Sequence, residues 1–162
     1  MYSKVKILGH PIHPMIVAFP VAFYTGTLVT NIIYACTLNS FWFKAALACN
    51  IAGVAAALLA AVPGFIDWLA IPSSKGAKKT GLYHMAANVS ALVLFTINIF
   101  IQYNRMDDVQ PEATASIIIC AAGFVLTIVA GFLGWTLVQN HHVGVSLTQA
   151  QENLEPAEGV KG

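Results

Sequence analysis

Five histidines are the side chains of this chain with the clearest ligand chemistry. Imidazole ligates zinc, copper, iron and nickel, and it is a common axial ligand of haem. The histidines stand at three places, near the N-terminus, in mid-chain and after the last apolar segment: His10 and His13, His84, and His141 and His142. They predict a metal or haem site if the fold brings them together.

The candidate ligand set combines four histidines with one acid: His10, His13, His84, His141 and Asp67. Two imidazoles from different helices would suit a b-type haem held between the helices. A mixed nitrogen and oxygen shell would suit a single transition-metal ion, with Asp67 as a ligand or as the acceptor that orients an imidazole N–H. The sequence leaves both alternatives open. It has no Cys-x-x-Cys-His motif, so a covalently attached haem is not expected.

No motif of a catalytic centre accompanies these residues. The sequence has no Ser/His/Asp order that suggests a triad, no nucleophile elbow and no glycine-rich phosphate loop. The three cysteines are expected to pack as small apolar side chains. We therefore predict no catalytic residues, and the sequence gives no ground for assigning an enzymatic activity.

The composition predicts a membrane protein. Of the 162 residues, 57% are hydrophobic and 9% are charged, whereas soluble domains carry roughly 25% charged residues. Four apolar segments are long enough to cross a hydrocarbon core of about 30 Å as helices. The net charge of +1 gives no basic footprint for nucleic acid. The predicted fold class is an all-α integral membrane four-helix bundle with a lipid bilayer around it.

The apolar segments also define the expected domains. Residues 1–13 form a basic leader with the loop Gly9-His10-Pro11-Ile12-His13-Pro14, and residues 139–162 form a loose polar tail. Between them lies the transmembrane domain, residues 14–138. Its four spans are expected at about residues 14–36, 44–62, 82–103 and 114–138.

Three prolines refine these boundaries. Pro14 suits the first position of a helix, which would place His13 at the N-cap. Pro20 lies inside the first span and should kink it, because it frees the carbonyl of Ile16. Pro63 is expected to end the second span.

The topology predicts one shared end for all candidate ligands. Four spans bring both termini to one side, together with the loop between the second and third spans. That side carries Lys4, Lys6, Lys75, Lys78 and Lys79, whereas Lys44 and Arg105 flank the other. The positive-inside rule then predicts a multi-pass protein of a bacterial inner membrane with cytoplasmic termini. Every span would deliver at least one ionisable side chain to the cytoplasmic end, and such groups near hydrocarbon are default site candidates.

Two other hypotheses explain the same histidines. Because two pairs are close in sequence, the five residues are only three independent placements, and imidazoles also occur at membrane interfaces as polar tips. The chain would then be a non-catalytic accessory subunit of a larger respiratory or photosynthetic membrane complex, consistent with its small size and its Ala- and Gly-rich helices. A third hypothesis is pH sensing, since imidazole titrates near neutrality.

Four motifs, in order along the chain, resemble a bacterial family of small four-span membrane proteins that is described only as a predicted membrane domain of unknown function. The resemblance covers about residues 8–145. Its motifs are Gly9-His10-Pro11-Ile12-His13-Pro14 with Phe19-Pro20, Val62-Pro63-Gly64-Phe65-Ile66-Asp67-Trp68-Leu69-Ala70-Ile71-Pro72, Lys79-Thr80-Gly81-Leu82-Tyr83-His84-Met85 with Asn88, and Gly131-Phe132-Leu133-Gly134 followed by His141 and Val143-Gly144-Val145.

The resemblance implies a redox neighbourhood, because members of the family are sometimes joined to Rieske iron–sulfur or cytochrome c domains. The family pattern carries over to His10, His13, Asp67, His84, Asn88 and His141. The chain departs from it at His142, where the family usually has Gly, and at Trp135 and Thr136, where family members often have Gly and a polar or acidic residue.

Together these observations predict a small integral membrane protein with a His/Asp cluster at the cytoplasmic end of the bundle. The cluster is expected to bind a transition-metal ion or haem b in a redox or electron-transfer context. Its partners would be other membrane-protein subunits or redox proteins.

Overall fold

The apolar segments form long helices in the computed structural model, which describes residues 3–73, 76–145, 148–149 and 153. The predicted tail is thus described only in small part, and Lys75 lies outside the described residues. The elements of the described chain are β1 (Lys6–Ile7), β2 (His10–Pro11), α1 (Ile12–Ile16), α2 (Ala18–Thr37), α3 (Ser40–Leu69), α4 (Gly76–Tyr103) and α5 (Thr114–Gln139).

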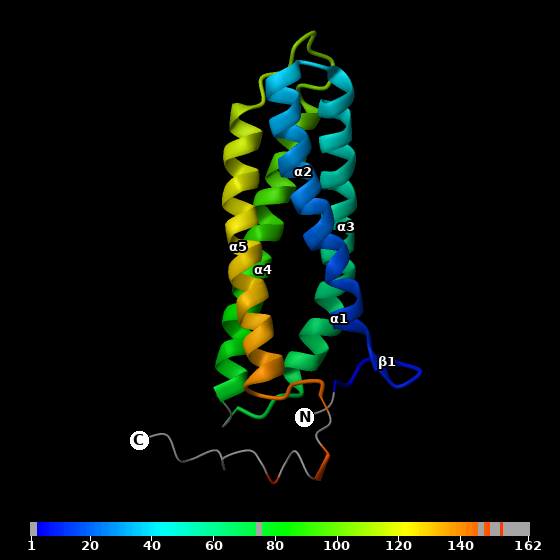
Figure 1. Ribbon diagram of the computed structural model, residues 1–162, viewed down its shortest axis with the longest axis vertical. Helices are drawn as coiled ribbons and strands as arrows, with labels where there is room; N and C mark the ends of the chain where they lie inside the picture. The colour runs from blue at the N-terminus through cyan, green and yellow to red at the C-terminus, as the bar shows by residue number, and fades with distance from the viewer. Residues whose placement is uncertain (1–2, 74–75, 146–147, 150–152, 154–162) are drawn as a thin grey trace.

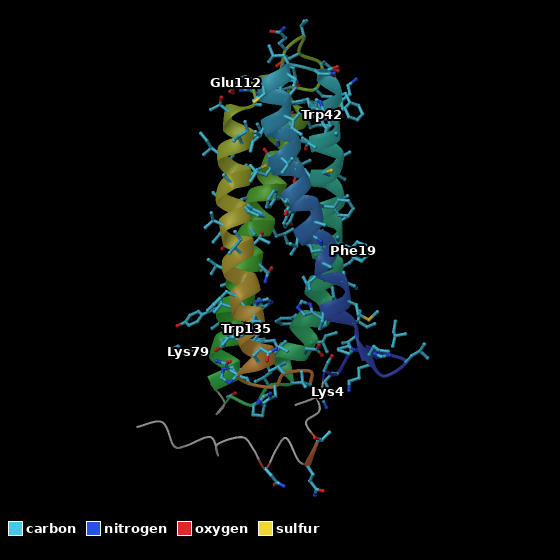
Figure 2. The ribbon with its side chains drawn as sticks, viewed as in Figure 1. Lys4, Phe19, Trp42, Lys79, Glu112 and Trp135 are labelled. Carbon is cyan, nitrogen blue, oxygen red and sulfur yellow. The ribbon has the colours of Figure 1, made fainter. Side chains whose placement is uncertain are left out.

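Four helical segments are long and apolar enough to cross a membrane: Ile12–Thr37, Ser40–Leu69, Gly76–Tyr103 and Thr114–Gln139. Their large apolar side chains point mostly outward, and Phe19 and Trp135 show this in Figure 2. Outward apolar and inward small or polar residues are the arrangement that lipid favours. The all-α four-helix bundle predicted from the sequence is confirmed.

The first span is interrupted close to the predicted kink. Helix α1 ends at Ile16 and α2 begins at Ala18, with Val17 between them. Pro20 has no N–H to donate to the carbonyl of Ile16, which explains why the regular helical hydrogen bonding is interrupted there. The predicted N-cap was wrong: Pro11 is the N-cap of α1, and His13 is its second residue.

The second span is longer than predicted. Helix α3 continues through Pro63 to Leu69, so the prediction that Pro63 ends this span was wrong. A proline inside a helix removes one backbone hydrogen bond. A helix bundle tolerates this loss when neighbouring helices pack closely around the proline. Pro63 is buried against the rest of the bundle. This extension carries Gly64 and Asp67 on the same continuous helix.

The leader forms a small hairpin tied to the end of α3. Strands β1 and β2 pair antiparallel, and the turn residues Leu8 and Gly9 have φ of 50° and 84°. Asp67 accepts hydrogen bonds from the Ser3 hydroxyl at 2.6 Å and from the Lys4 backbone N–H at 2.7 Å. These contacts fix the chain just before α1.

The helices pack as two hairpins. Helix α2 packs mainly on α3, and α4 packs mainly on α5, while α3 with α4 and α2 with α5 close the bundle. Figure 1 shows the four long helices side by side, with the start of α1 and the end of α3 on one side of the lower part and α4 and α5 on the other. Lys4 and Lys79 lie at this end, and Trp42 and Glu112 lie at the opposite end (Figure 2).

The two hairpins repeat each other's buried positions. A shift of 71 residues along the chain takes four of the five buried residues of α2 onto buried residues of α4: Pro20 onto Ala91, Tyr24 onto Phe95, Thr27 onto Asn98, and Asn31 onto Gln102. The same shift takes His13 onto His84. Few of these pairs are identical, which hides the repeat in the sequence.

Helices α3 and α5 repeat in the same way with a shift of 70 residues. Their paired positions are Ala46 and Ser116, Asn50 and Cys120, Gly53 and Gly123, Ala60 and Ala130, and Gly64 and Gly134. The contacts repeat as well, because a Cβ at Gly53 would meet the Tyr24 ring and a Cβ at Gly123 would meet the Phe95 ring. The two rings stack on each other with centroids 3.7 Å apart. The bundle therefore has an approximate two-fold axis that runs along its length and relates the two hairpins.

Candidate functional site

Two histidines face each other where the hairpins meet. The ring centroids of His13 and His84 are 6.1 Å apart, and the ring planes are nearly perpendicular, at 88°. His13 comes from α1 and His84 from α4, and the repeat makes them equivalent positions. The prediction that histidines from different spans come together is met by this pair.

Each ring is fixed by the same hydrogen bond. Nδ1 of His13 lies 2.8 Å from the carbonyl oxygen of Ala60, and Nδ1 of His84 lies 2.8 Å from that of Ala130. A carbonyl oxygen only accepts, so each Nδ1 carries the proton and donates it. In a neutral imidazole the remaining nitrogen, Nε2, then holds the lone pair that binds a metal.

A glycine on the neighbouring helix leaves room for each ring. A Cβ added at Gly64 would lie 2.7 Å from the His13 ring, and one at Gly134 would lie 3.1 Å from the His84 ring. Each glycine stands four residues after the alanine whose carbonyl accepts from that ring. The pattern Ala-x-x-x-Gly thus provides both the acceptor and the space, once in each hairpin.

Asn88 breaks the equivalence of the two rings. Its side-chain amide donates to Nε2 of His84 at 3.2 Å and to the His84 carbonyl oxygen at 2.9 Å. The equivalent position in the first hairpin is Val17, which has no side-chain donor. Asn88 is exposed on a membrane span, where a polar side chain is expected to face a partner or a ligand.

The other predicted ligands lie elsewhere. His10 is exposed in the leader hairpin, and His141 has its Nε2 3.5 Å from the Thr80 hydroxyl. Both oxygens of Asp67 accept hydrogen bonds from the leader. Among the described residues, no group of three or more His, Cys, Asp or Glu side chains is placed to hold a metal ion. The structure therefore brings together one pair of the five predicted ligands.

A second polar layer was missed from the sequence. Asn31, Asn50, Asn98 and Gln102 are completely buried at the other end of the bundle, with the thiol of Cys120. The signal was the presence of amides inside apolar spans, with Asn98 and Gln102 four residues apart and thus on one helix face.

The match to a known family covers most of the chain. Residues 9–147 match the family described as predicted membrane protein (DUF2231). The chain belongs to the DUF2231 family. No curated protein and no solved structure matches the chain. The DUF2231 match spans both facing histidines and their two glycines, and the function of this membrane protein family is unknown.

Proposed function

We propose that this DUF2231 protein is a membrane haem protein in which His13 and His84 would hold a b-type haem, and that the haem would serve electron transfer. The observation that carries the proposal is the facing pair of imidazoles, one from each hairpin. Haem between helices of a bundle is commonly held by histidines from different helices.

The separation of the rings suits this ligation. A nitrogen–metal bond is about 2 Å long, so two imidazoles on opposite sides of one metal have ring centroids roughly 6 Å apart. The observed separation is 6.1 Å. Both Nδ1 atoms donate to backbone carbonyls, so Nε2 is the nitrogen of each ring that would bind the metal. On His84 the metal would replace the hydrogen bond from Asn88.

The symmetry of the site favours haem over a single ion with a mixed shell. The two-fold axis relates the two imidazoles, and a haem can be held by two equivalent histidines. A structural or catalytic zinc site needs at least three protein ligands. The described residues bring no third His, Cys, Asp or Glu side chain to this pair.

The protein's own groups would orient and tune such a haem. Hydrogen bonds from Nδ1 to Ala60 and Ala130 hold the ring orientations and make the imidazoles more basic ligands. Gly64 and Gly134 let each ring lie against the neighbouring helix. When bound, haem supplies reversible one-electron chemistry, and the apolar spans around it would exclude water.

We also propose that this end of the bundle faces the cytoplasm of a bacterial cell. Its described cations are Lys4, Lys6, Lys78 and Lys79, whereas Lys44 and Arg105 flank the other end. The positive-inside rule supports this orientation. It would place the haem near the cytoplasmic leaflet, within reach of a redox partner on that side.

Haem titration of the purified protein tests the proposal. Full-length protein in detergent is titrated with haemin, and a Soret band with sharp reduced α and β bands at one haem per chain is expected. His13→Ala and His84→Ala should each abolish the low-spin spectrum. His10→Ala and His141→Ala are matched controls and should keep it. A wild-type protein that binds no stoichiometric haem, or a spectrum lost equally in the controls, would contradict the assignment.

A further inference from the structure

The second polar layer crosses the two-fold axis at the end away from the histidines. Its side chains come from all four long helices: Asn31 from α2, Asn50 from α3, Asn98 and Gln102 from α4, and Cys120 from α5. Each of them is 0% exposed. We call these five residues the amide layer. Buried amides in a membrane span are costly unless every polar atom has a partner.

Most donors of the amide layer have partners within it. Gln102 Nε2 donates to Asn31 Oδ1 at 3.1 Å, and Gln102 Oε1 accepts from Asn98 at 3.0 Å and from Asn50 at 3.4 Å. The Cys120 sulfur accepts from Asn98 at 3.2 Å. These bonds link the two hairpins directly.

Two acceptors and one hydroxyl of the same region remain without a partner among the described residues. They are Asn50 Oδ1, Asn98 Oδ1 and Ser116 Oγ, and their residues are almost completely buried. Asn50 and Asn98 donate to the same oxygen of Gln102, so their side chains lie close together. Ser116 is one turn before Cys120 on the same face of α5.

A molecule bound between these three atoms would have to match their hydrogen-bonding chemistry. Two carbonyl oxygens need a molecule that donates twice, and a serine hydroxyl can donate to an atom that accepts. Water meets this need, and buried waters typically make about three such hydrogen bonds. A metal cation would also be attracted to the oxygens, but the amide layer contains no carboxylate to balance its charge.

We infer that the bundle holds an internal water molecule in the amide layer, donating to Asn50 Oδ1 and Asn98 Oδ1 and accepting from the Ser116 hydroxyl. This water completes a polar network that joins α3, α4 and α5 across the axis. The site lies where the halves differ, because the equivalents of Asn50 and Ser116 are Cys120 and Ala46. It is independent of the proposed haem site.

The variant Ser116→Ala tests this inference, because the thermal midpoint should change in different directions with and without the water. If the hydroxyl donates to a water, its loss breaks one hydrogen bond in the network, and the thermal midpoint should fall by about 2–4 °C. If the hydroxyl has no partner, its removal should leave the midpoint unchanged or raise it, which would overturn the inference. Ser90→Ala, on the exposed face of α4, is the control and should not change the midpoint.

A high-resolution structure of the full chain identifies the occupant. Density for one solvent molecule within hydrogen-bonding distance of Asn50 Oδ1 and Asn98 Oδ1 is expected in the wild type and not in Ser116→Ala. Empty space between these atoms in the wild type would overturn the inference. A thermal midpoint that rises with sodium chloride but not with choline chloride would also overturn it, because the occupant would then be a cation.

Discussion

At the scale of single residues, the site depends on how each imidazole is held. A histidine near hydrocarbon is a poor ligand if its ring can rotate, because ordering the ring then opposes binding. Here a backbone carbonyl fixes Nδ1, and a glycine on the neighbouring helix leaves room for the ring. These two features, present once in each hairpin, distinguish His13 and His84 from His10 and His141.

Alanine at Gly64 should weaken haem binding. The added Cβ would lie 2.7 Å from the His13 ring, so the ring must move away from Ala60. Changes to groups that orient a ligand typically cost about 10–100-fold in affinity, and we expect that loss in a haemin titration. Gly134→Ala should have a smaller effect, because its Cβ would be 3.1 Å from the His84 ring.

Gly131→Ala is the control for both variants. A Cβ at Gly131 would have nothing within 4 Å, although the residue lies on the same helix as Gly134. Alanine also favours helix over glycine, so this variant should keep wild-type haem affinity and gain a little stability. Equal losses of haem affinity in all three variants would contradict the proposed role of Gly64 and Gly134.

Removal of the Asn88 amide should not prevent haem binding. Asn88 donates to Nε2 of His84, the nitrogen that would bind iron, so the two partners compete for one lone pair. We expect Asn88→Ala to bind haemin at least as tightly as the wild type, measured by the same titration. A large loss of affinity would instead mean that Asn88 supports the bound haem directly.

The sequence predicted that imidazoles would gather at one end of the bundle, but it could not select which of them would meet. His13 and His84 were in the candidate set, yet nothing in the sequence separated them from His10 and His141. The distinction depends on which carbonyl and which glycine lie opposite each ring, and this follows only from helix packing. The amide layer was not predicted: Asn98 and Gln102 share a helix face, but Asn31, Asn50 and Cys120 come from three other helices, and only the packing of the helices brings them together.

At the scale of elements, the long helices determine where the site lies in the bundle. The number and order of the spans were predicted, since long apolar segments have few alternatives in a bilayer. The bounds were less accurate, because α3 ends at Leu69 instead of about residue 62 and α4 begins at Gly76 instead of about residue 82. The passage of α3 through Pro63 was not predicted, because the tolerance of a proline depends on packing that sequence spacing does not reveal. Asp67 likewise anchors the leader, although it was expected near the histidines.

The start of α5 is stabilised by a carboxylate whose effect should depend on pH. Hydrogen bonds from Thr114 and the nearby Arg105 guanidinium hold the pKa of Glu112 below its usual value. A lowered pKa in the folded state contributes stability above the unfolded value, and this contribution is lost as the pH falls through the folded value.

Glu112→Gln should therefore lower the thermal midpoint slightly at pH 7, and the difference from the wild type should shrink as the pH falls through the lowered pKa of Glu112 in the folded state. Because Glu112 is exposed, added salt should reduce the difference at pH 7. Thermal melts of both proteins across this pH range measure the effect. A difference that grows toward low pH would contradict it.

At the scale of the whole molecule, the approximate two-fold axis explains the arrangement of the bundle. The axis passes between His13 and His84 at one end, through the Tyr24–Phe95 stack, and through the amide layer at the other end. The proposed haem and the inferred water both lie between the hairpins. The sequence does not reveal this axis, because burial repeats while residue identity mostly does not.

The axis predicts that the chain can be divided between its hairpins and still assemble. Residues 1–73 carry His13, Ala60 and Gly64, and residues 74–162 carry His84, Ala130 and Gly134, so each half brings one complete ligand unit. Co-expression of the two halves in one membrane should yield a complex that copurifies through a tag on either half. Hydrogen bonds such as that from Gln102 to Asn31 would hold the two halves together.

The divided protein should bind one haem per pair of halves, because neither half alone supplies both axial ligands. Absorption spectra of the copurified complex and of each half expressed separately make the comparison. His84→Ala in the second half should abolish the spectrum without preventing copurification, since the amide layer would still join the hairpins. A low-spin spectrum from the first half alone would contradict a site shared across the axis, and halves that never associate would contradict the repeat as an assembly interface.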